Sequence, residues 1–185
     1  GNSNFDVRHA FKGYTVYELP FGRGRAHFNQ NKLADAVIGG WRLSGSIVAQ
    51  SGSPFTPVMA VNNSFSLSTN NSWFPNVVGN PVLANPTINR WFDVSAFAAP
   101  TPGTFGNMGR NILDGPGLFT VNMSLAKTFT IREGFFFDLT GNATNALNHP
   151  AFGPPDRLIG PGRVGNITST RVPSRQIELV FKLRF

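Results

Sequence analysis

The chain has 185 residues, of which 41% are hydrophobic and only 14% are charged. That charged fraction is well below the ~25% typical of soluble domains, yet no run approaches the ~18 apolar residues that a membrane helix needs. The absence of cysteine excludes a disulfide framework and thiolate metal sites.

A net charge of +7 raises the question of nucleic-acid binding. The basic residues are scattered along the chain, however, and their one local cluster consists of Arg23, Arg25, His27 and Lys32. We interpret this cluster as a positively charged rim or turn, and we expect no nucleic-acid partner.

Strand periodicity recurs along the chain, with an apolar residue at every second position. A strand turns successive side chains to opposite faces, so this pattern predicts one apolar face and one polar face. Each segment has about ten residues or more, against ~5–6 in soluble proteins and the ~9–11 that a tilted membrane strand needs. The predicted strands are residues 7–19, 41–50, 120–131, 135–147 and 175–185.

These lengths and faces predict an all-β fold, in which the strands form an up-and-down antiparallel segment of a transmembrane β-barrel. The third strand departs from the pattern, because Lys127 interrupts its apolar face. The residues leave two interpretations open. Lys127 either extends to a membrane interface or marks a β-bulge.

The connections differ in size, which predicts an orientation. Residues 132–134 form a tight turn with Gly134 where a positive φ is needed, whereas 51–119 and 148–174 are long. Outer-membrane barrels keep short turns on the periplasmic side and long loops outside. We therefore expect 51–119 and 148–174 to be extracellular.

The connection over residues 20–40 falls on the periplasmic side by the same alternation. It is long for a periplasmic turn, and residues 33–38 are suited to a short helix. Gly39 and Gly40 follow that segment and predict a glycine stop.

The 51–119 connection is too rich in aromatic residues for a disordered tail, so we expect a folded lid. Trp73 and Trp91 could stack on a sugar or ring of a ligand at the barrel mouth. Arg90 is a third candidate ligand contact. The alternative is that both tryptophans pack the core of the loop itself.

The last predicted strand ends on an aromatic residue, Phe185, without a polar tail. A soluble sheet edge this apolar would promote aggregation, but the closing strand of an outer-membrane barrel needs one face toward lipid and an aromatic residue at the interface. Its apolar face carries Ile177, Leu179, Phe181, Leu183 and Phe185.

No motif in the sequence predicts catalysis. The three histidines, His9, His27 and His149, are not paired with nucleophiles, and no His, Asp or Glu cluster has metal-ligand spacing. The glycine-rich segment 103–109 lacks the Lys-Ser/Thr of a phosphate loop. We expect no enzyme activity, no cofactor and no metal.

Several short motifs, in order, resemble the C-terminal barrel of TonB-dependent receptors, most closely the Oar-like proteins with a carboxypeptidase-regulatory-like N-terminal domain. The final motif resembles the end of the penultimate strand of that family, with Leu147 where Phe is common. The motifs are Phe5–His9, Tyr17–Gly22, Gly39–Gly45, Gln50–Phe55, Arg90–Asp93 with Ala96 and Phe97, Gly103–Asn107, and Asn142–Pro150.

The resemblance covers essentially the whole chain and implies the C-terminal strands of a large plugged barrel in the outer membrane of a Gram-negative-type bacterium. Such receptors take up ligands with energy from the inner-membrane TonB complex. The ligand here is unidentified. Because the chain begins at Gly1 without an initiator Met, we interpret it as part of a longer protein with the plug upstream.

The resemblance also implies that Phe181, Leu183 and Phe185 form the signal that the barrel-assembly machinery reads during insertion. Outer-membrane lipid is the remaining expected partner. The rival hypothesis is a soluble, secreted all-β binding module, such as an adhesin or a glycan-binding domain. That rival requires the apolar strand faces to pack against one another.

Overall fold

The computed structural model describes residues 2–22, 24–27, 32–66 and 73–185. The chain divides into two compact units. The sheet unit comprises residues 11–49, 119–150 and 172–185. The loop unit comprises residues 1–10, 50–118 and 151–171.

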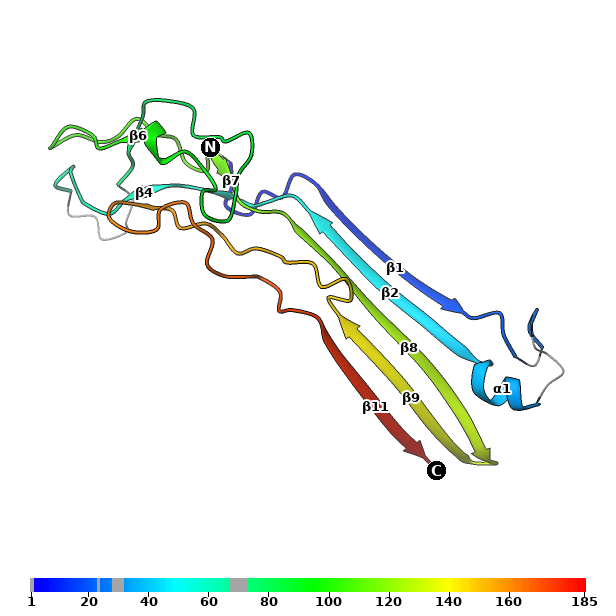
Figure 1. The fold of residues 1–185 in the computed structure, drawn as a ribbon. Helices are drawn as coiled ribbons and strands as arrows, with labels where there is room; N and C mark the ends of the chain where they lie inside the picture. Colours follow the sequence, from blue (N-terminus) through cyan, green and yellow to red (C-terminus); the bar gives the residue numbers. More distant parts are fainter. Residues whose placement is uncertain (1, 23, 28–31, 67–72) are drawn as a thin grey trace. The chain divides into compact units, whose positions relative to one another are not determined.

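The sheet unit is built on one sheet of five long strands that lie side by side in chain order (Figure 1). The strands are β1 (Ala10–Glu18), β2 (Trp41–Gln50), β8 (Leu118–Arg132), β9 (Phe135–Thr144) and β11 (Gln176–Arg184). Within the described residues the sheet is a single layer that does not close on itself. The predicted all-β class and the antiparallel order of the strands are confirmed.

Three strands are shorter than the sequence pattern predicts, β11 by one residue at each end, while β8 is longer. β1 begins at Ala10 rather than at residue 7, and β9 ends at Thr144 rather than at 147. β9 stops because Asn145 adopts a φ of 49° and Asn148 a φ of 51°, a left-handed conformation that a strand cannot contain.

The pairing register places apolar residues together on one face of the sheet. Phe129 of β8 lies opposite Phe137 of β9, which in turn lies opposite Leu183 of β11. On the other face, Thr128 lies opposite Asp138, which lies opposite Lys182. The predicted alternation is therefore maintained across these three strands.

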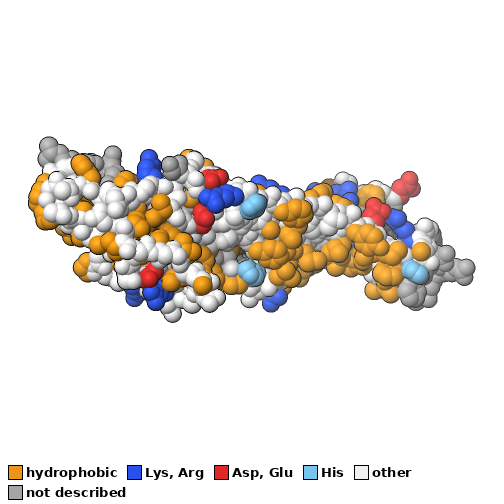
Figure 2. Space-filling view, turned by 90° about the horizontal axis from the view of Figure 1, so that it is seen from above, with side chains coloured by type: hydrophobic (Ala, Val, Ile, Leu, Met, Phe, Trp, Pro, Cys, Tyr) orange, Lys and Arg blue, Asp and Glu red, His pale blue; other side chains and the backbone are white. Residues whose placement is uncertain are grey.

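No described element forms a second layer over the main part of the apolar face. Along β11 every residue is exposed, with Ile177 at 71% and Leu183 at 66%. In the space-filling view, hydrophobic side chains accordingly form patches at the surface (Figure 2). An exposed apolar face of this extent marks a surface that contacts a membrane or another molecule.

The turn between β8 and β9 has the predicted glycine conformation. Arg132 pairs with Phe135, and Gly134 adopts a φ of 78°. The register of the ladder shifts between Thr130 and Arg132, which places a β-bulge next to the turn. A positive φ and an adjacent bulge are typical of hairpins closed by a glycine.

The short helix α1 (Lys32–Ile38) precedes β2, as the sequence predicts. Gly40 follows it with a φ of 71°, the left-handed conformation that ends many helices. The Trp41 indole nitrogen donates to the Val37 carbonyl at 2.9 Å, which ties the helix end to the start of β2. Within the described ranges, no helix is long and apolar enough to cross a membrane.

The loop unit contains pairs of very short strands and a 3-10 turn, η1 (Val94–Ala96). Its strand pairs are β3 (Pro54–Phe55) with β7 (Leu113–Asp114), β4 (Val58–Met59) with β10 (Leu158–Ile159), and β5 (Asn76–Val77) with β6 (Phe97–Ala98). A cluster of buried residues holds these pieces together, consisting of Phe92, Phe97, Met108 and Leu113. The segment is folded, as its aromatic content predicts.

Candidate functional site

The polar face of the sheet carries a row of hydroxyl and amide side chains. The Ser124 hydroxyl donates to the Asn142 side-chain oxygen at 2.8 Å, and Asn142 donates to Glu178 at 3.4 Å. These groups line an open hollow together with Tyr14, Ser44, Ser46, Asn122 and Thr144. Such a surface is suited to water or to a hydrogen-bonding polar partner.

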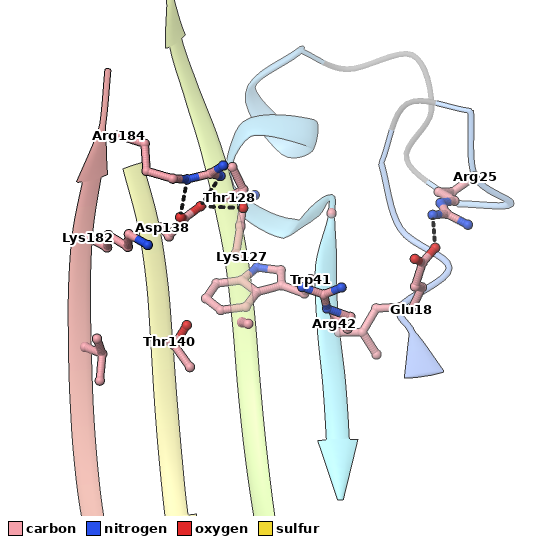
Figure 3. A pocket seen from close by; sticks show the side chains of 14 residues that line it. Glu18, Arg25, Trp41, Arg42, Lys127, Thr128, Asp138, Thr140, Lys182 and Arg184 are labelled. Carbon is pink, nitrogen blue, oxygen red and sulfur yellow. Dashed lines mark hydrogen bonds and ion pairs between the residues drawn. The ribbon is translucent and has the colours of Figure 1, made fainter. Parts of the chain in front are cut away.

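Nearer the β8–β9 turn the same face becomes charged and encloses a groove of about 470 Å³ (Figure 3). Its floor consists of small side chains from the central strands, including Ala126 and Thr140. Its charged side chains are those of Glu18, Arg25, Arg42, Asp138, Lys182 and Arg184, while Lys127 borders the groove but directs its ammonium to α1.

Asp138 is the centre of the hydrogen bonding in this groove. It accepts from Nε of Arg184 at 2.7 Å, from Nη2 of Arg184 at 2.9 Å and from the Thr128 hydroxyl at 2.6 Å. On the β1 side, Arg25 pairs with Glu18. Because cations outnumber carboxylates in the lining, the groove favours an anionic or strongly hydrogen-bonding partner.

Neither hollow contains a nucleophile with an activating base. Among the residues that the structure describes, no group of three or more His, Asp or Glu side chains could hold a metal ion. The arrangement supports binding through charge and hydrogen bonds.

Comparison with known proteins agrees with the architecture. A family model described as an outer membrane beta barrel domain matches residues 1–178. The chain belongs to this outer-membrane β-barrel family. No curated protein matches the chain, and no solved structure matches it.

Membership of this family gives each face of the sheet its environment. Outer-membrane barrels turn an apolar band toward lipid and a polar surface toward the lumen. The exposed apolar face is therefore the lipid-facing one, and the charged groove faces the interior. The chain is located in the outer membrane of a Gram-negative bacterium, so the soluble binding module is not favoured.

The three residues predicted as an assembly signal lie at the lipid-facing surface. Phe181 is 62% exposed, and its ring stacks on that of Phe137 with centroids 6.1 Å apart. Phe185 follows β11, and its ring stacks on that of Phe135 at 6.3 Å. Leu183 lies between them on the same face. Recognition of this ridge by the assembly machinery stays a prediction.

Lys127 does not behave as either interpretation expects. Its pairing with Leu139 is regular, so the bulge interpretation is wrong at this position, and the register shift lies further along β8. The side chain is only 5% exposed, and its ammonium donates to the Ala36 carbonyl at 2.7 Å and to the Asp35 carbonyl at 3.3 Å. Instead of extending to an aqueous interface, it is buried against α1.

The three predicted ligand contacts are all in the loop unit and occupy different settings. The Trp91 indole nitrogen donates to the Asp114 carbonyl at 2.9 Å, and the ring packs against the buried cluster. Trp73 lines a small hollow whose lining includes neither Trp91 nor Arg90. Contact with a ligand stays a prediction for all three residues.

Trp73 has one unusual property. Its indole nitrogen is buried and has no hydrogen-bond partner among the described residues. By contrast, the exposed Arg90 pairs with Asp93, with Nη2 2.8 Å from Oδ1.

Asp93 anchors the loop around η1. Its side chain accepts from the Ser95 backbone at 3.1 Å and from the Ser95 hydroxyl at 2.8 Å, which caps the 3-10 turn. Hydrogen bonds from the Ser95 side chain and then from Arg90 hold the pKa of Asp93 below its ordinary value. This arrangement fixes the backbone beside Trp91 and Phe92.

Sequence reasoning placed Thr128 and Asp138 on the polar face but missed their linkage to Arg184. The available signal was the regular occurrence of charged residues at alternate positions in neighbouring strands. Only the register decides which of them meet. Of the basic cluster expected near a turn, Arg25 lines the groove, while Arg23 lies outside the described residues.

Proposed function

We propose that this chain supplies the C-terminal wall of a TonB-dependent outer-membrane receptor of the Oar-like type, which takes up an unidentified ligand. The observation that carries the proposal is the polar face. Small barrels fill their interior with side chains, whereas this wall has an open charged groove and an open polar row. A wall of that kind suits a wide lumen with a separate occupant.

The motif resemblance narrows the choice among outer-membrane barrels. Its motifs extend over both the sheet unit and the loop unit, and they occur in the order found in Oar-like receptors. The proposal places the Glu133–Gly134 turn on the periplasmic side and the loop unit outside the cell. It assigns no enzyme activity, metal or cofactor to the chain.

The proposed partners follow from this role. Lipid contacts the apolar face, and the barrel-assembly machinery reads β11, which is an edge strand of the described sheet. The TonB complex acts through a plug encoded outside these 185 residues. Within the loop unit, Arg90 is the clearest residue for testing ligand contact, because its side chain is exposed and lies outside the buried cluster.

The direct test is photo-crosslinking of TonB in cells that produce the full-length protein. A crosslinkable amino acid is placed in the segment upstream of Gly1 and, as a control, at Glu133 in the short turn. We expect an upstream position to give an adduct with TonB, and we expect the yield of this adduct to depend on the proton-motive force. A full-length sequence without a plug, together with no adduct at any upstream position, would contradict the receptor proposal while leaving the barrel assignment intact.

A further inference from the structure

Lys127 projects a cation from the face of the sheet that meets lipid. Its neighbours on that face of β8 are Leu125 and Phe129, and the opposing residue on β9 is Leu139. A bare ammonium among such neighbours would be costly in a bilayer. The structure must therefore provide this charge with a local substitute for water.

Helix α1 provides that substitute. Two carbonyl oxygens near its C-terminal end, those of Asp35 and Ala36, accept from the Lys127 ammonium. This end of a helix carries the negative part of the helix dipole, and the Asp35 carbonyl accepts from the Gly39 backbone at 3.0 Å as well as from Lys127. Charge and hydrogen-bonding capacity are thus matched.

Two aromatic rings complete the enclosure of the ammonium. The Lys127 nitrogen lies 4.8 Å from the centroid of the Phe129 ring and 5.8 Å from that of Trp41. Both distances are within the range of a cation–π interaction. Trp41 also donates to the Val37 carbonyl, so the same group of residues fixes both Lys127 and the helix.

The outer surface of α1 is apolar where it leaves this enclosure. Val37 is 68% exposed and Ile38 is 40% exposed. The helix is attached to the lipid-facing side of the sheet through Lys127, so these side chains continue the surface that already contacts lipid. Aliphatic side chains on a helix beside a tryptophan are typical of segments at the boundary between headgroups and acyl chains.

We propose that α1 is a membrane-interface helix, with Val37 and Ile38 resting against phospholipid on the side of the β8–β9 turn, and that Lys127 is the residue that holds it there. The helix shields the cation from lipid, and the cation keeps the helix at the bilayer surface. This role depends on the barrel family and on the geometry around Lys127, and it does not require TonB-dependent transport.

The first experiment measures the depth of α1 in the bilayer. The full-length protein, with any native cysteines replaced, is reconstituted in vesicles of phosphatidylethanolamine and phosphatidylglycerol. The chain itself has no cysteine, so Val37→Cys gives a single site here for a nitroxide label. Leu179→Cys on the lipid face and Glu133→Cys in the turn are the lipid and water controls.

Electron paramagnetic resonance then compares relaxation of the label by oxygen, which partitions into lipid, with relaxation by a water-soluble nickel chelate. We expect the Val37 label to be intermediate between the two controls, with reduced access to nickel. Access to nickel equal to that of the Glu133 label would place α1 in water and overturn the proposal.

The second experiment tests Lys127 through Lys127→Met, which keeps an unbranched apolar side chain but removes the charge and the donors. Hydrogen–deuterium exchange at residues 35–40 should rise by roughly 10- to 100-fold, as expected for the loss of hydrogen bonds from a charged group. Lys127→Arg should restore much of the protection. The matched control, Lys182→Met, removes a cation from the polar face and should leave residues 35–40 unchanged.

Heat modifiability of each variant on gels verifies that the barrel has formed, so that the exchange data report on α1 alone. Unchanged exchange in a folded Lys127→Met barrel would show that Lys127 does not hold the helix. An equal rise in the Lys182→Met barrel would show that the effect is not specific to the lipid-facing cation. Either result would overturn this role of Lys127.

Discussion

The loop unit and the sheet unit are both rich in phenylalanine, but they place these side chains in opposite environments. In the loop unit, Phe92 is 1% exposed and its ring contacts those of Phe55 and Phe97 at 5.8 and 5.9 Å. In the sheet unit, Phe181 stacks on Phe137 but is 62% exposed. The loop unit excludes water from its own core, whereas the sheet unit depends on lipid to do so.

Polar groups follow the same division. Asn111, buried in the loop unit, donates from its side chain to the Asn2 carbonyl at 2.6 Å and to Asn4 at 2.7 Å, and it exchanges hydrogen bonds with Thr56. A unit with an enclosed core must satisfy its buried polar groups internally. On the polar face of the sheet, Ser124 and Asn142 bond to each other and at the same time line an open hollow.

The strongest test of the comparison is Phe92→Ala. Removing a fully buried aromatic ring should destabilise the loop unit by about 3–5 kcal/mol. Hydrogen–deuterium exchange at residues 91–114 of the full-length protein should rise steeply, while heat modifiability of the barrel stays unchanged. Phe105→Ala is the matched control, because Phe105 is 76% exposed. Similar effects of the two substitutions would show that the loop unit has no core of its own.

The corresponding test of the sheet unit is Phe181→Arg. An arginine on the lipid face should cost about 2–4 kcal/mol near the bilayer midplane, and less near an interface. Glu178→Arg places the same side chain on the polar face of the same strand and should cost much less. The measurement is urea unfolding of the barrel in phospholipid vesicles. Equal tolerance of arginine at both positions would reject the assigned facing.

A smaller effect is expected where β9 leaves the sheet. Asn145 is 2% exposed, and its side chain bonds to the His149 backbone and to the Pro173 carbonyl. Asn145→Ala should cost about 2–3 kcal/mol, at roughly 1 kcal/mol for each lost hydrogen bond. Asn148→Ala is a close control, since Asn148 also has a positive φ but is exposed. Indistinguishable unfolding midpoints would remove the role assigned to the buried amide.

The smallest predicted effect is a pH dependence confined to η1. Because the pKa of Asp93 is lowered in the folded chain, its contribution to stability is present above the unfolded value of 3.8 and is lost as the pH falls through the lower folded value. Exchange at residues 94–97 is compared with that of Asp93→Asn at each pH. We expect the natural chain to be better protected above pH 3.8 and this difference to vanish in more acidic solution. A difference that persists there would contradict the assigned cause.

Residues of the motifs that resemble the Oar-like receptors have structural roles in the loop unit. Phe92 of the Arg90–Asp93 motif is the most deeply buried phenylalanine that the structure describes, and Asp93 caps η1. Asn107 accepts from the Val77 backbone and donates from its own backbone to Asn76. These residues shape the loops, and none of them had to contact a ligand to be recognisable.

What the sequence determined by itself is whatever depends on local periodicity. Alternation with period two specifies a strand and its two faces, and Gly40 and Gly134 specify backbone conformations that few other residues adopt. The strands, their chain order, the short helix and the tight turn could all be predicted for that reason. The outer-membrane location was predicted from strand length and from the apolar face of the last strand, and the family match confirms it.

Only the tertiary structure decided which side chains meet, because pairing across strands depends on register and on long-range packing. It joined Asp138 of β9 to Arg184 of the neighbouring strand β11, and it placed Trp91 against the loop core. It also showed how the charge of Lys127 is accommodated on the apolar face of its strand. The partner of that charge is a helix about 90 residues earlier in the chain, and local sequence carries no information about a contact at that separation.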